Sequence, residues 1–311
     1  MSAGGEVEVT CPHCGARFTV PATASRVTCP YCFSVFTIQG VQPEEEHYYF
    51  PLDESLDPFE RLLKFVSRQY GVPLDLRSNF AVSRRDLHWV PVYFFFGDYK
   101  AKASGYSRVY GEQTSEITET GLVSIPASGT ELDSVLERYP FSIRGKLPFT
   151  PEITSKGRFF NPTISRSDAE RKADSMFMYK IRLEAAESFS SLQSLVVVQK
   201  KLEYRGLVHY PIWILEYTYK GRPFRAMVDG ASGVVIRTEY PQTAKGRISL
   251  AAYSSLTLLL GLAGGLAYAW LVNGGFLAVI GGLAVGAAAA LPAFTRSATL
   301  VASASEYTEF R

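Results

Sequence analysis

Cysteine is absent from the chain after Cys32. All four cysteines of the 311 residues lie near the N-terminus, so none remains to cross-link the rest of the chain. A disulfide-built extracellular fold is therefore not expected. The first residues also lack the basic start and apolar core of a secretory signal, and we expect the N-terminus to stay in the cytosol.

Charge is missing from another part of the chain. No charged side chain occurs between Ile248 and Phe294, although the mean hydropathy of the whole chain is only +0.02. As a helix, residues 248–272 can cross a hydrocarbon core of about 30 Å, and residues 276–293 supply a return span after a short turn. These lengths predict a two-pass transmembrane hairpin, with the buried core of a soluble protein as the alternative.

Basic residues predict the orientation of this hairpin. Lys245 and Arg247 precede the first span and Arg296 follows the second, while the turn carries no charge. The positive-inside rule then predicts a cell-membrane protein with both termini in the cytoplasm.

Small residues recur at every fourth position in both spans and allow helix backbones to approach closely. They are Gly261, Gly265 and Ala269 in the first span and Ala278, Gly282, Gly286 and Ala290 in the second. Such stripes pack either the two helices of one hairpin, or a second copy, or another membrane protein.

Familiar catalytic signatures are also absent. The chain contains no GxxxxGK[ST], GxSxG, HExxH or GxGxxG motif. His88 and His209 precede prolines by three and two residues, so strand alternation would point them to opposite faces, and we interpret them as ordinary sheet histidines. We predict no catalytic residue and no enzyme activity. The formal net charge of +2 does not require a polyanionic partner.

Two CxxC pairs are the strongest motif that the chain does contain. Cys11 and Cys14 form the first pair and Cys29 and Cys32 the second. Two such turns supply the four-sulfur tetrahedron that Zn²⁺ accepts, with no open position for hydrolysis. A module as small as residues 6–40 needs the metal to fold. A structural zinc ribbon is favoured over a rubredoxin-like iron site and over redox-active thiols.

The region after residue 40 has the pattern of an α+β body. An acidic, proline-containing run suggests a linker over residues 41–55, and Asp57-Pro58-Phe59-Glu60 predicts a helix start with an end at Gly71. Aromatic and β-branched runs from Phe80 predict antiparallel strands. A capping box at Ser167-Asp168-Ala169-Glu170 predicts a second helix to about residue 187, followed by strand. Residues 222–228 and 234–240 predict a hairpin.

Two segments of the body resemble each other. Residues 87–100 and 207–220, aligned on Pro91 and Pro211, share a leucine four positions before the proline and Tyr-Lys eight and nine after it. A duplicated helix-plus-sheet unit is favoured over a coincidence of composition.

The duplication makes specific structural predictions. Pro91 and Pro211 should stand at the start of a strand. Tyr93 and Trp213 should both point inward against the helix that precedes them.

The predicted organisation is thus multi-domain and ends in a short cytoplasmic tail. Its parts are a ribbon at 6–40, a linker at 41–55, two helix-plus-sheet units at 56–150 and 151–245, a membrane hairpin at 246–294 and a tail at 295–311.

The chain resembles a group of prokaryotic zinc-ribbon membrane proteins of poorly known function. The resemblance rests on CPHCG and CPYC, on Pro211-Ile212-Trp213 with Tyr217, Tyr219 and Gly221, on residues 228–234, and on Pro241 with Lys245. It implies a TFIIB-like or rubredoxin-like ribbon, an α+β middle and a C-terminal hairpin, and it implies no reaction. Some members are labelled as helicase- or primosome-related, but the nucleotide-binding motifs of a helicase are absent here.

Three functions fit these observations. The favoured hypothesis is a membrane-anchored, cytoplasm-facing adaptor or scaffold that binds a cytosolic or membrane protein. The alternatives are a membrane-attached nucleic-acid-binding protein and an enzyme with an unrecognised site between the two repeats. The sequence leaves open whether the protein forms a homo-oligomer.

Overall fold

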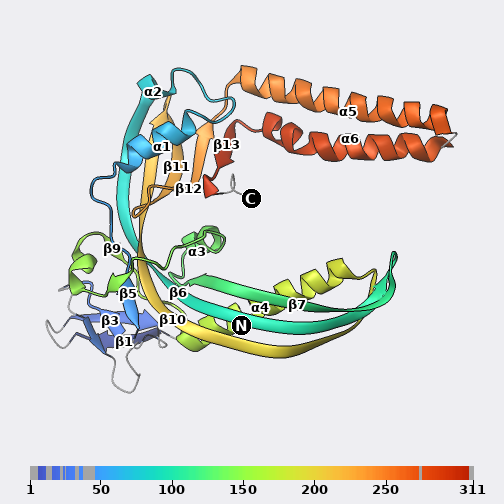
Figure 1. The fold of residues 1–311 in the computed structure, drawn as a ribbon. Coiled ribbons are helices and arrows are strands. Elements are labelled where there is room, and N and C mark those ends of the chain that lie inside the picture. The colour runs from blue at the N-terminus through green and yellow to red at the C-terminus, as the bar shows by residue number, and fades with distance from the viewer. Residues whose placement is uncertain are drawn as a thin grey trace. The chain divides into compact units, whose positions relative to one another are not determined.

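The structure is a computed structural model that describes residues 6–11, 16–21, 24, 26–31, 35–37, 46–272 and 275–307. An α+β body is followed by two apolar helices (Figure 1). The contacts divide the chain into two compact units. Unit 1 contains Met1–Ser55, Asp86–Trp213 and Asp229–Ser232, and unit 2 contains Leu56–Arg85, Ile214–Val228 and Gly233–Arg311.

Two small hairpins open the chain. Strand β1 (Glu6–Thr10) pairs antiparallel with β2 (Arg17–Pro21), and β3 (Arg26–Thr28) pairs antiparallel with β4 (Val35–Thr37). Polar and apolar residues alternate in β2, at Arg17-Phe18-Thr19-Val20, as is typical of a strand with one buried face. A small apolar cluster joins the hairpins and contains Val9, Val20, Ala24 and Val27.

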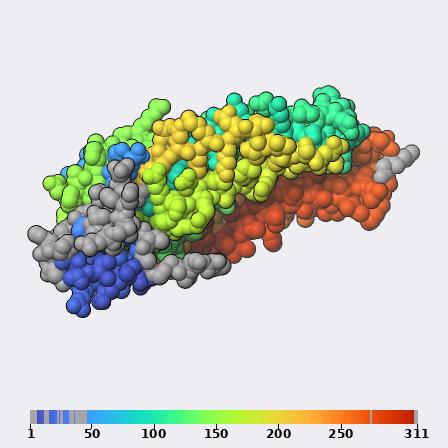
Figure 2. Space-filling view, turned by 90° about the horizontal axis from the view of Figure 1, so that it is seen from below, coloured from blue at the N-terminus to red at the C-terminus, as the bar shows by residue number. Residues whose placement is uncertain are grey.

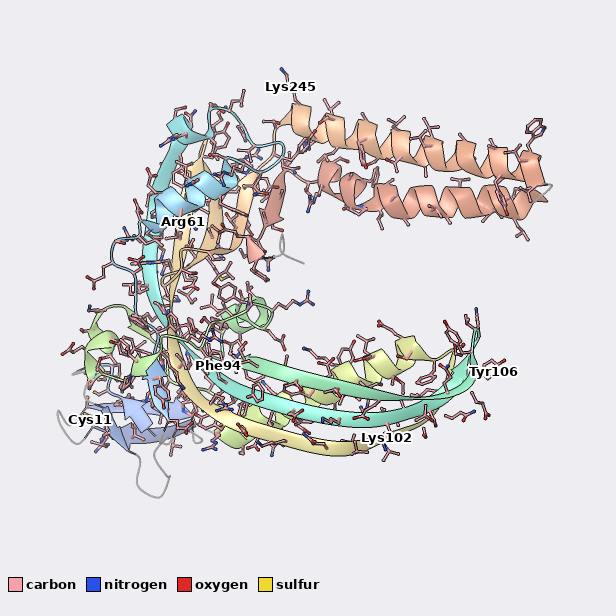
Figure 3. The ribbon with its side chains drawn as sticks, viewed as in Figure 1. Cys11, Arg61, Phe94, Lys102, Tyr106 and Lys245 are labelled. Carbon is pink, nitrogen blue, oxygen red and sulfur yellow. The ribbon has the colours of Figure 1, made fainter. Side chains whose placement is uncertain are left out.

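A sheet built on two very long strands dominates unit 1. Strand β6 (Phe80–Ser107) pairs antiparallel with β7 (Gly111–Pro126) from Val92↔Pro126 to Ser107↔Gly111, and it also pairs with β10 (Ser191–Tyr219). Figure 3 shows Phe94, Lys102 and Tyr106 spread along β6. Both β6 and β10 begin in one unit and end in the other.

Short elements complete unit 1. Strand β5 (His47–Tyr49) pairs parallel with β10 and antiparallel with β8 (Leu147–Pro148), and β9 (Arg158–Phe159) pairs parallel with β6. Helix α3 (Glu131–Leu136) and the 3₁₀ turn η1 (Pro151–Ser155) lie between them in sequence. Residues 47–49 were expected to be part of a linker, but the structure places them in the sheet.

Helix α4 (Arg166–Ser188) covers one face of β6 and β7. Its buried side chains recur at every fourth position, at Ala169, Ala173, Phe177, Ile181 and Ala185, and they pack on Tyr93, Phe95, Tyr99 and Ile125 of the sheet. A Cβ atom on Gly97 would lie 2.4 Å from the Phe177 ring, so this strand position needs glycine. The helix was expected, but its cap is Ser165, whose side chain accepts from the Asp168 N–H, two residues before the predicted start.

Unit 2 contains the hairpin that residues 222–228 and 234–240 predicted. Strand β11 (Arg222–Asp229) pairs antiparallel with β12 (Val235–Pro241), and helix α1 (Pro58–Val66) packs on β12. Asp57 caps α1 by accepting from the Phe59 N–H, as the sequence predicted. The α-helix ends at Val66, before Gly71, and a short helix α2 (Leu76–Asn79) leads into β6.

The C-terminal helices are continuous with this sheet. Helix α5 (Ala244–Val272) follows β12, and α6 (Gly275–Ala298) is followed by strand β13 (Val301–Ala304), which pairs antiparallel with β12 from Thr238↔Ala304 to Pro241↔Val301. Residues 301–304 were expected in a cytoplasmic tail. They form the edge strand of the sheet because β12 offers them a hydrogen-bonding edge.

The units differ from the predicted halves 56–150 and 151–245. Helix α4, which precedes the second repeat segment, packs on β7 of the first, while α1, which precedes the first, packs on β12 of the second. Each half of the chain therefore contributes a helix to the sheet of the other half.

The prediction that Pro91 and Pro211 start a strand was wrong. Pro91 and Pro211 lie in the middle of β6 and β10, and the strands around them are buried on both faces. The prediction for the aromatic residues was also wrong in the packing partner. Tyr93 packs on α4, which follows it in the chain, and Trp213 packs in a separate cluster with Trp89 and Leu87.

Candidate functional site

The described cysteines lie in the two small hairpins. Cys11 directly follows β1 and Cys29 directly follows β3, and both are buried. The Cys11 N–H donates to the Ala16 carbonyl at 2.9 Å and thereby joins the residue after β1 to the residue before β2. Cys14 and Cys32 lie outside the described residues. Among the described residues no group of three metal-ligating side chains is present.

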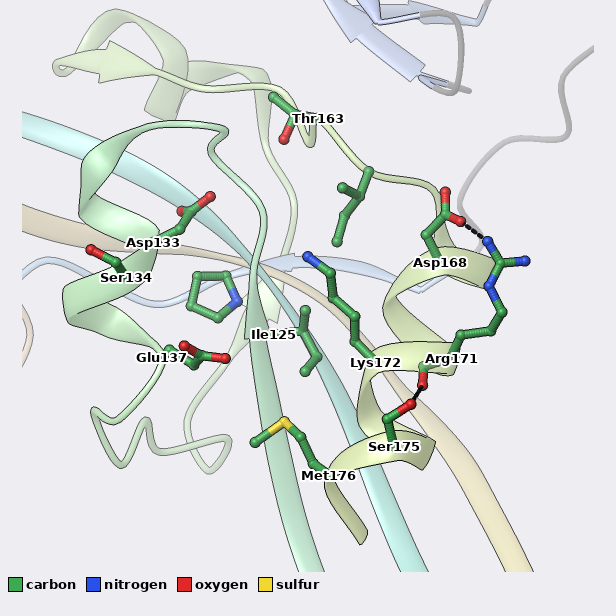
Figure 4. Close-up of a pocket in the computed structure, with 12 residues that line it drawn as sticks. Ile125, Asp133, Ser134, Glu137, Thr163, Asp168, Arg171, Lys172, Ser175 and Met176 are labelled. Carbon is green, nitrogen blue, oxygen red and sulfur yellow. Dashed lines mark hydrogen bonds and ion pairs between the residues drawn. The ribbon is translucent and has the colours of Figure 1, made fainter. Parts of the chain in front are cut away.

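A groove of about 820 Å³ lies in unit 1 between α3, α4 and the end of β7 (Figure 4). Its volume is within the range of ligand pockets, about 300–1,000 Å³. Apolar side chains line its floor and polar ones its rims. The lining residues are Ile125, Pro126, Asp133, Ser134, Glu137, Thr163, Ile164, Asp168, Arg171, Lys172, Ser175 and Met176.

Two acids of the groove have structural partners. Asp133 accepts hydrogen bonds from the Ser128 and Gly129 N–H groups at 3.0 and 2.8 Å and holds the turn before α3. Asp168 accepts from Ser165 at the start of α4 and pairs with Arg171. The hydrogen bond from Ser165 lowers the pKa of Asp168, so this carboxylate stays charged at neutral pH.

The remaining charges face the groove from opposite rims. Glu137 follows the end of α3 and Lys172 belongs to α4, and in Figure 4 both side chains point into the groove. Neither forms an ion pair with another described residue. The groove can therefore offer an apolar floor, one anionic rim and one cationic rim to a ligand. Sequence analysis did not find it, although Thr130 and Asp133 have the spacing of a helix cap.

The tyrosines of the two repeat segments make matching contacts. The Tyr99 hydroxyl donates to Asp174 at 2.6 Å, and Lys200 pairs with that carboxylate at 2.7 Å. Partial burial acts to raise the pKa of Asp174, but the bonds from Lys200 and Tyr99 outweigh it and hold the pKa below its usual value.

Tyr219 in the second segment has a similar arrangement, although its lysine is the adjacent Lys220, whereas Lys200 belongs to a different strand from Tyr99. The Tyr219 hydroxyl donates to Asp75 at 2.7 Å, and Lys220 pairs with Asp75 at 2.8 Å. The bond from Lys220 lowers the pKa of Asp75. These contacts join strand residues to helical segments, and we assign them a structural role.

The sheet histidines have unequal surroundings. His209 is fully buried, its Nε2 lies 3.0 Å from the Phe160 carbonyl, and its Nδ1 lies 3.0 Å from His47 Nε2. Burial lowers the pKa of His209 to about 3. Since a carbonyl only accepts, Nε2 carries the proton of neutral His209 and Nδ1 accepts from His47. His88 is also buried, beside Phe160.

Four glycines of the apolar helices, Gly261, Gly265, Gly282 and Gly286, lie at the contact between α5 and α6. A Cβ atom on Gly282 would lie 2.4 Å from the Gly261 carbonyl and 2.6 Å from the Gly265 Cα. A Cβ on Gly261 would lie 2.6 Å from the Gly286 Cα, and one on Gly265 2.9 Å from the Ala278 carbonyl. Within the hairpin these glycines let the two backbones approach, and Ala290 is buried on α6.

Comparison with protein-family models, curated proteins and solved structures gives no match for the chain.

Proposed function

We propose that the protein is a membrane-anchored adaptor that binds a segment of a protein partner in the groove between α3 and α4. The groove carries the proposal, because an apolar floor between rims of opposite charge suits a peptide segment with both apolar and charged side chains. A cytosolic partner is favoured, since the soluble body is much larger than the anchor.

The membrane part of the proposal rests on α5 and α6. Both helices are long and apolar enough to cross a membrane. Pro241 before α5 is paired with Val301 after α6, so the hairpin starts and ends at neighbouring strands. Both ends would therefore lie on one side of the bilayer. Lys245 stands at the start of α5 in Figure 3, and with Arg247 and Arg296 it favours the cytoplasmic side.

For the N-terminal hairpins we infer one structural Zn²⁺ held by Cys11, Cys14, Cys29 and Cys32. Support comes from the two described cysteines, which are buried at equivalent places, each directly after the first strand of its hairpin. Four thiolates give a closed site that stabilises a module too small to fold through its apolar cluster alone.

We also infer that the body arose by duplication. The Pro91 carbonyl accepts from the Ala127 N–H at 2.9 Å, and the Pro211 carbonyl accepts from the Gly230 N–H at 2.8 Å. Each proline thus stands at the base of a hairpin, and each copy has its tyrosine bonded to an aspartate that pairs with a lysine.

Site-specific photocrosslinking tests the groove. A photoreactive residue at Ser134 or Ser175, in the full chain in native membranes, should crosslink one partner polypeptide in stoichiometric yield. Ser175→Trp, which fills the groove, should abolish the Ser134 product, while Ser188→Trp at the exposed end of α4 should not. The same product from exposed Ser78 in unit 2 would contradict groove binding, and a nucleic-acid adduct at Ser134 would favour the alternative function.

A further inference from the structure

One edge of the unit 1 sheet is open beside the groove. Strand β7 pairs with β6 along Gly111–Pro126, and within the described residues no strand pairs with its other edge. Such an edge presents a row of backbone N–H and C=O groups to which an extended peptide can add.

The open edge leads into the groove. Ile125 and Pro126, the last residues of β7, form part of the groove floor. Beyond them the Thr163 N–H donates to the Ala127 carbonyl at 2.8 Å, so the edge is closed past this point. A strand added to β7 would therefore enter the groove at the end of β7, between α3 and α4 (Figure 4).

The charge along this edge is of one sign. Residues 109–137 contain no Lys or Arg, although the whole chain has a net charge of +2. Their acidic residues are Glu112, Glu116, Glu119, Glu131, Asp133 and Glu137. Like charges oppose the pairing of two copies of β7, whereas a strand with Lys or Arg would be attracted.

The register of β6 and β7 tells which glutamates share a face. Ile117 and its partner Ala101 are buried under α4, so Glu116 and Glu112 lie on the opposite face of β7. Both are exposed and lie four residues apart, about 13 Å along the strand. Lys102 stands opposite Glu116 on the β6 side, which leaves the outer side of both glutamates to an added strand.

We propose that the partner segment is extended and basic, and that it adds as a strand to β7 before it enters the groove. Lys or Arg residues four positions apart would face Glu112 and Glu116. This proposal rests on the groove as the docking site and names the conformation and charge of its occupant.

A second copy of the chain is a poorer occupant. On the other side of β6 the sheet continues with β10, which lies at the surface beside α4 in Figure 2. Its cations already have partners, since Lys200 pairs with Asp174 at 2.7 Å and Lys201 with Glu203 at 2.6 Å. Arg205 also pairs with Glu203.

Peptide probes and hydrogen exchange test the proposal on the full chain in a neutral detergent. The probe is a peptide of about twelve residues that alternates Val and Lys, compared with a Val-Glu peptide and with a Val-Lys peptide N-methylated at alternate residues. The Val-Lys probe should protect β7 amides between residues 111 and 124, and the other two should not.

A matched pair of variants tests the charge. Glu112→Lys with Glu116→Lys should weaken binding of the Val-Lys probe about tenfold, because two attractions become repulsions. Glu184→Lys with Glu187→Lys, on the exposed end of α4, makes the same change in net charge and should have little effect.

Four results would overturn strand addition. They are equal weakening by both pairs of variants, binding that survives N-methylation, protection of β10 instead of β7, and protection of β7 by self-association without peptide. Failure of groove docking is distinguishable, because the Ser134 photocrosslink and its loss in Ser175→Trp do not depend on β7. A groove-specific crosslink without protection of the β7 amides would contradict strand addition but leave groove docking in place.

Discussion

His209 shows how much a residue can depend on its place in the fold. Its ring is enclosed by Phe149, Phe159 and His47, and this burial favours the neutral form of the imidazole. The unfolded chain offers the same ring to water, where its pKa is near 6.5. Folding therefore excludes a proton that the unfolded chain binds below that pH.

Acidification should destabilise the fold through this residue. Between pH 6.5 and the folded pKa of about 3 the unfolded state holds one more proton, so the free energy of unfolding should fall by about 1.4 kcal/mol per pH unit as pH decreases. Denaturant unfolding of the full chain, followed by Trp89 and Trp213 fluorescence, should show this loss between pH 6 and 5.

His209→Gln supplies the comparison, since it retains an N–H donor without a titrating ring. Between pH 6 and 5 the free energy of unfolding of this variant should fall by about 1.4 kcal/mol less than that of the unchanged protein. Equal pH dependence in the two proteins would contradict the assignment. If the variant does not fold, an NMR titration of the full chain supplies the test. Protonation of the His209 ring above pH 5 would contradict the assignment.

A second prediction at the residue scale concerns the four cysteines, which we expect to hold one metal ion. Purified protein should contain about one zinc per chain, and Cys29→Ser should expose the amides of β1–β4 to hydrogen exchange without releasing the protein from membranes. His13→Ala, within the first CxxC pair, should keep its zinc. Stoichiometric iron, or neither metal, in elemental analysis would contradict the prediction.

At the scale of elements, glycine decides how two helices meet and how a strand continues. From the sequence alone, Gly97 would suggest the end of a strand, but it lies within β6. Glycine is needed at this position because the Phe177 ring occupies the space that a Cβ atom would fill. Gly206 has φ +114 within β10 and packs against Tyr48, so it marks an irregularity and not an end. The long strands therefore follow from packing by α4 and β5.

Neighbouring glycines of α6 should respond differently to substitution. Gly282→Leu should separate α5 from α6 and cost roughly 1–3 kcal/mol, because its Cβ alone would lie 2.4 Å from the Gly261 carbonyl. Gly281→Leu should have little effect, since nothing described lies within 4 Å of a Cβ there. Thermal unfolding in detergent measures both, and equal losses would show that the helices do not pack on this face.

At the scale of the whole molecule, the two halves of the chain exchange helices. Helix α4 belongs by sequence to the second half and by packing to the first, and α1 shows the reverse. Strand β13 returns the chain to the sheet after the apolar helices. Beyond β13, the Glu306 N–H donates to the Val235 carbonyl at 2.9 Å, so the residues after α6 are tied to the α+β body.

The proposed membrane topology can be tested by labelling on intact cells. A cysteine placed at Gly274 should react with an impermeant thiol reagent on intact cells, because the connection between α5 and α6 would be the extracytoplasmic part. One placed at Glu306 should react only after the cells are opened, since Glu306 lies beside β12. Labelling at Glu306 but not at Gly274 in intact cells would reverse the orientation.

Local patterns were sufficient for several features. A chargeless run of hydrophobic residues predicts apolar helices, and these form at α5 and α6. Asp57 and Pro58 predict a helix start, and the β11–β12 hairpin lies where its turn residues predicted it. Each feature depends on residues close in the chain, so the sequence alone contains the necessary physics.

The tertiary structure decided what depends on distant partners. The strand formed by residues 47–49 and the packing of α1 on β12 require segments far apart in the chain to meet. The packing of α4 on β7, the neutral state of His209 and the groove beside β7 also depend on segments that are not neighbours in sequence. Periodicity reports which face of an element is buried, but it does not report which element buries it. That choice belongs to the packing of the whole chain.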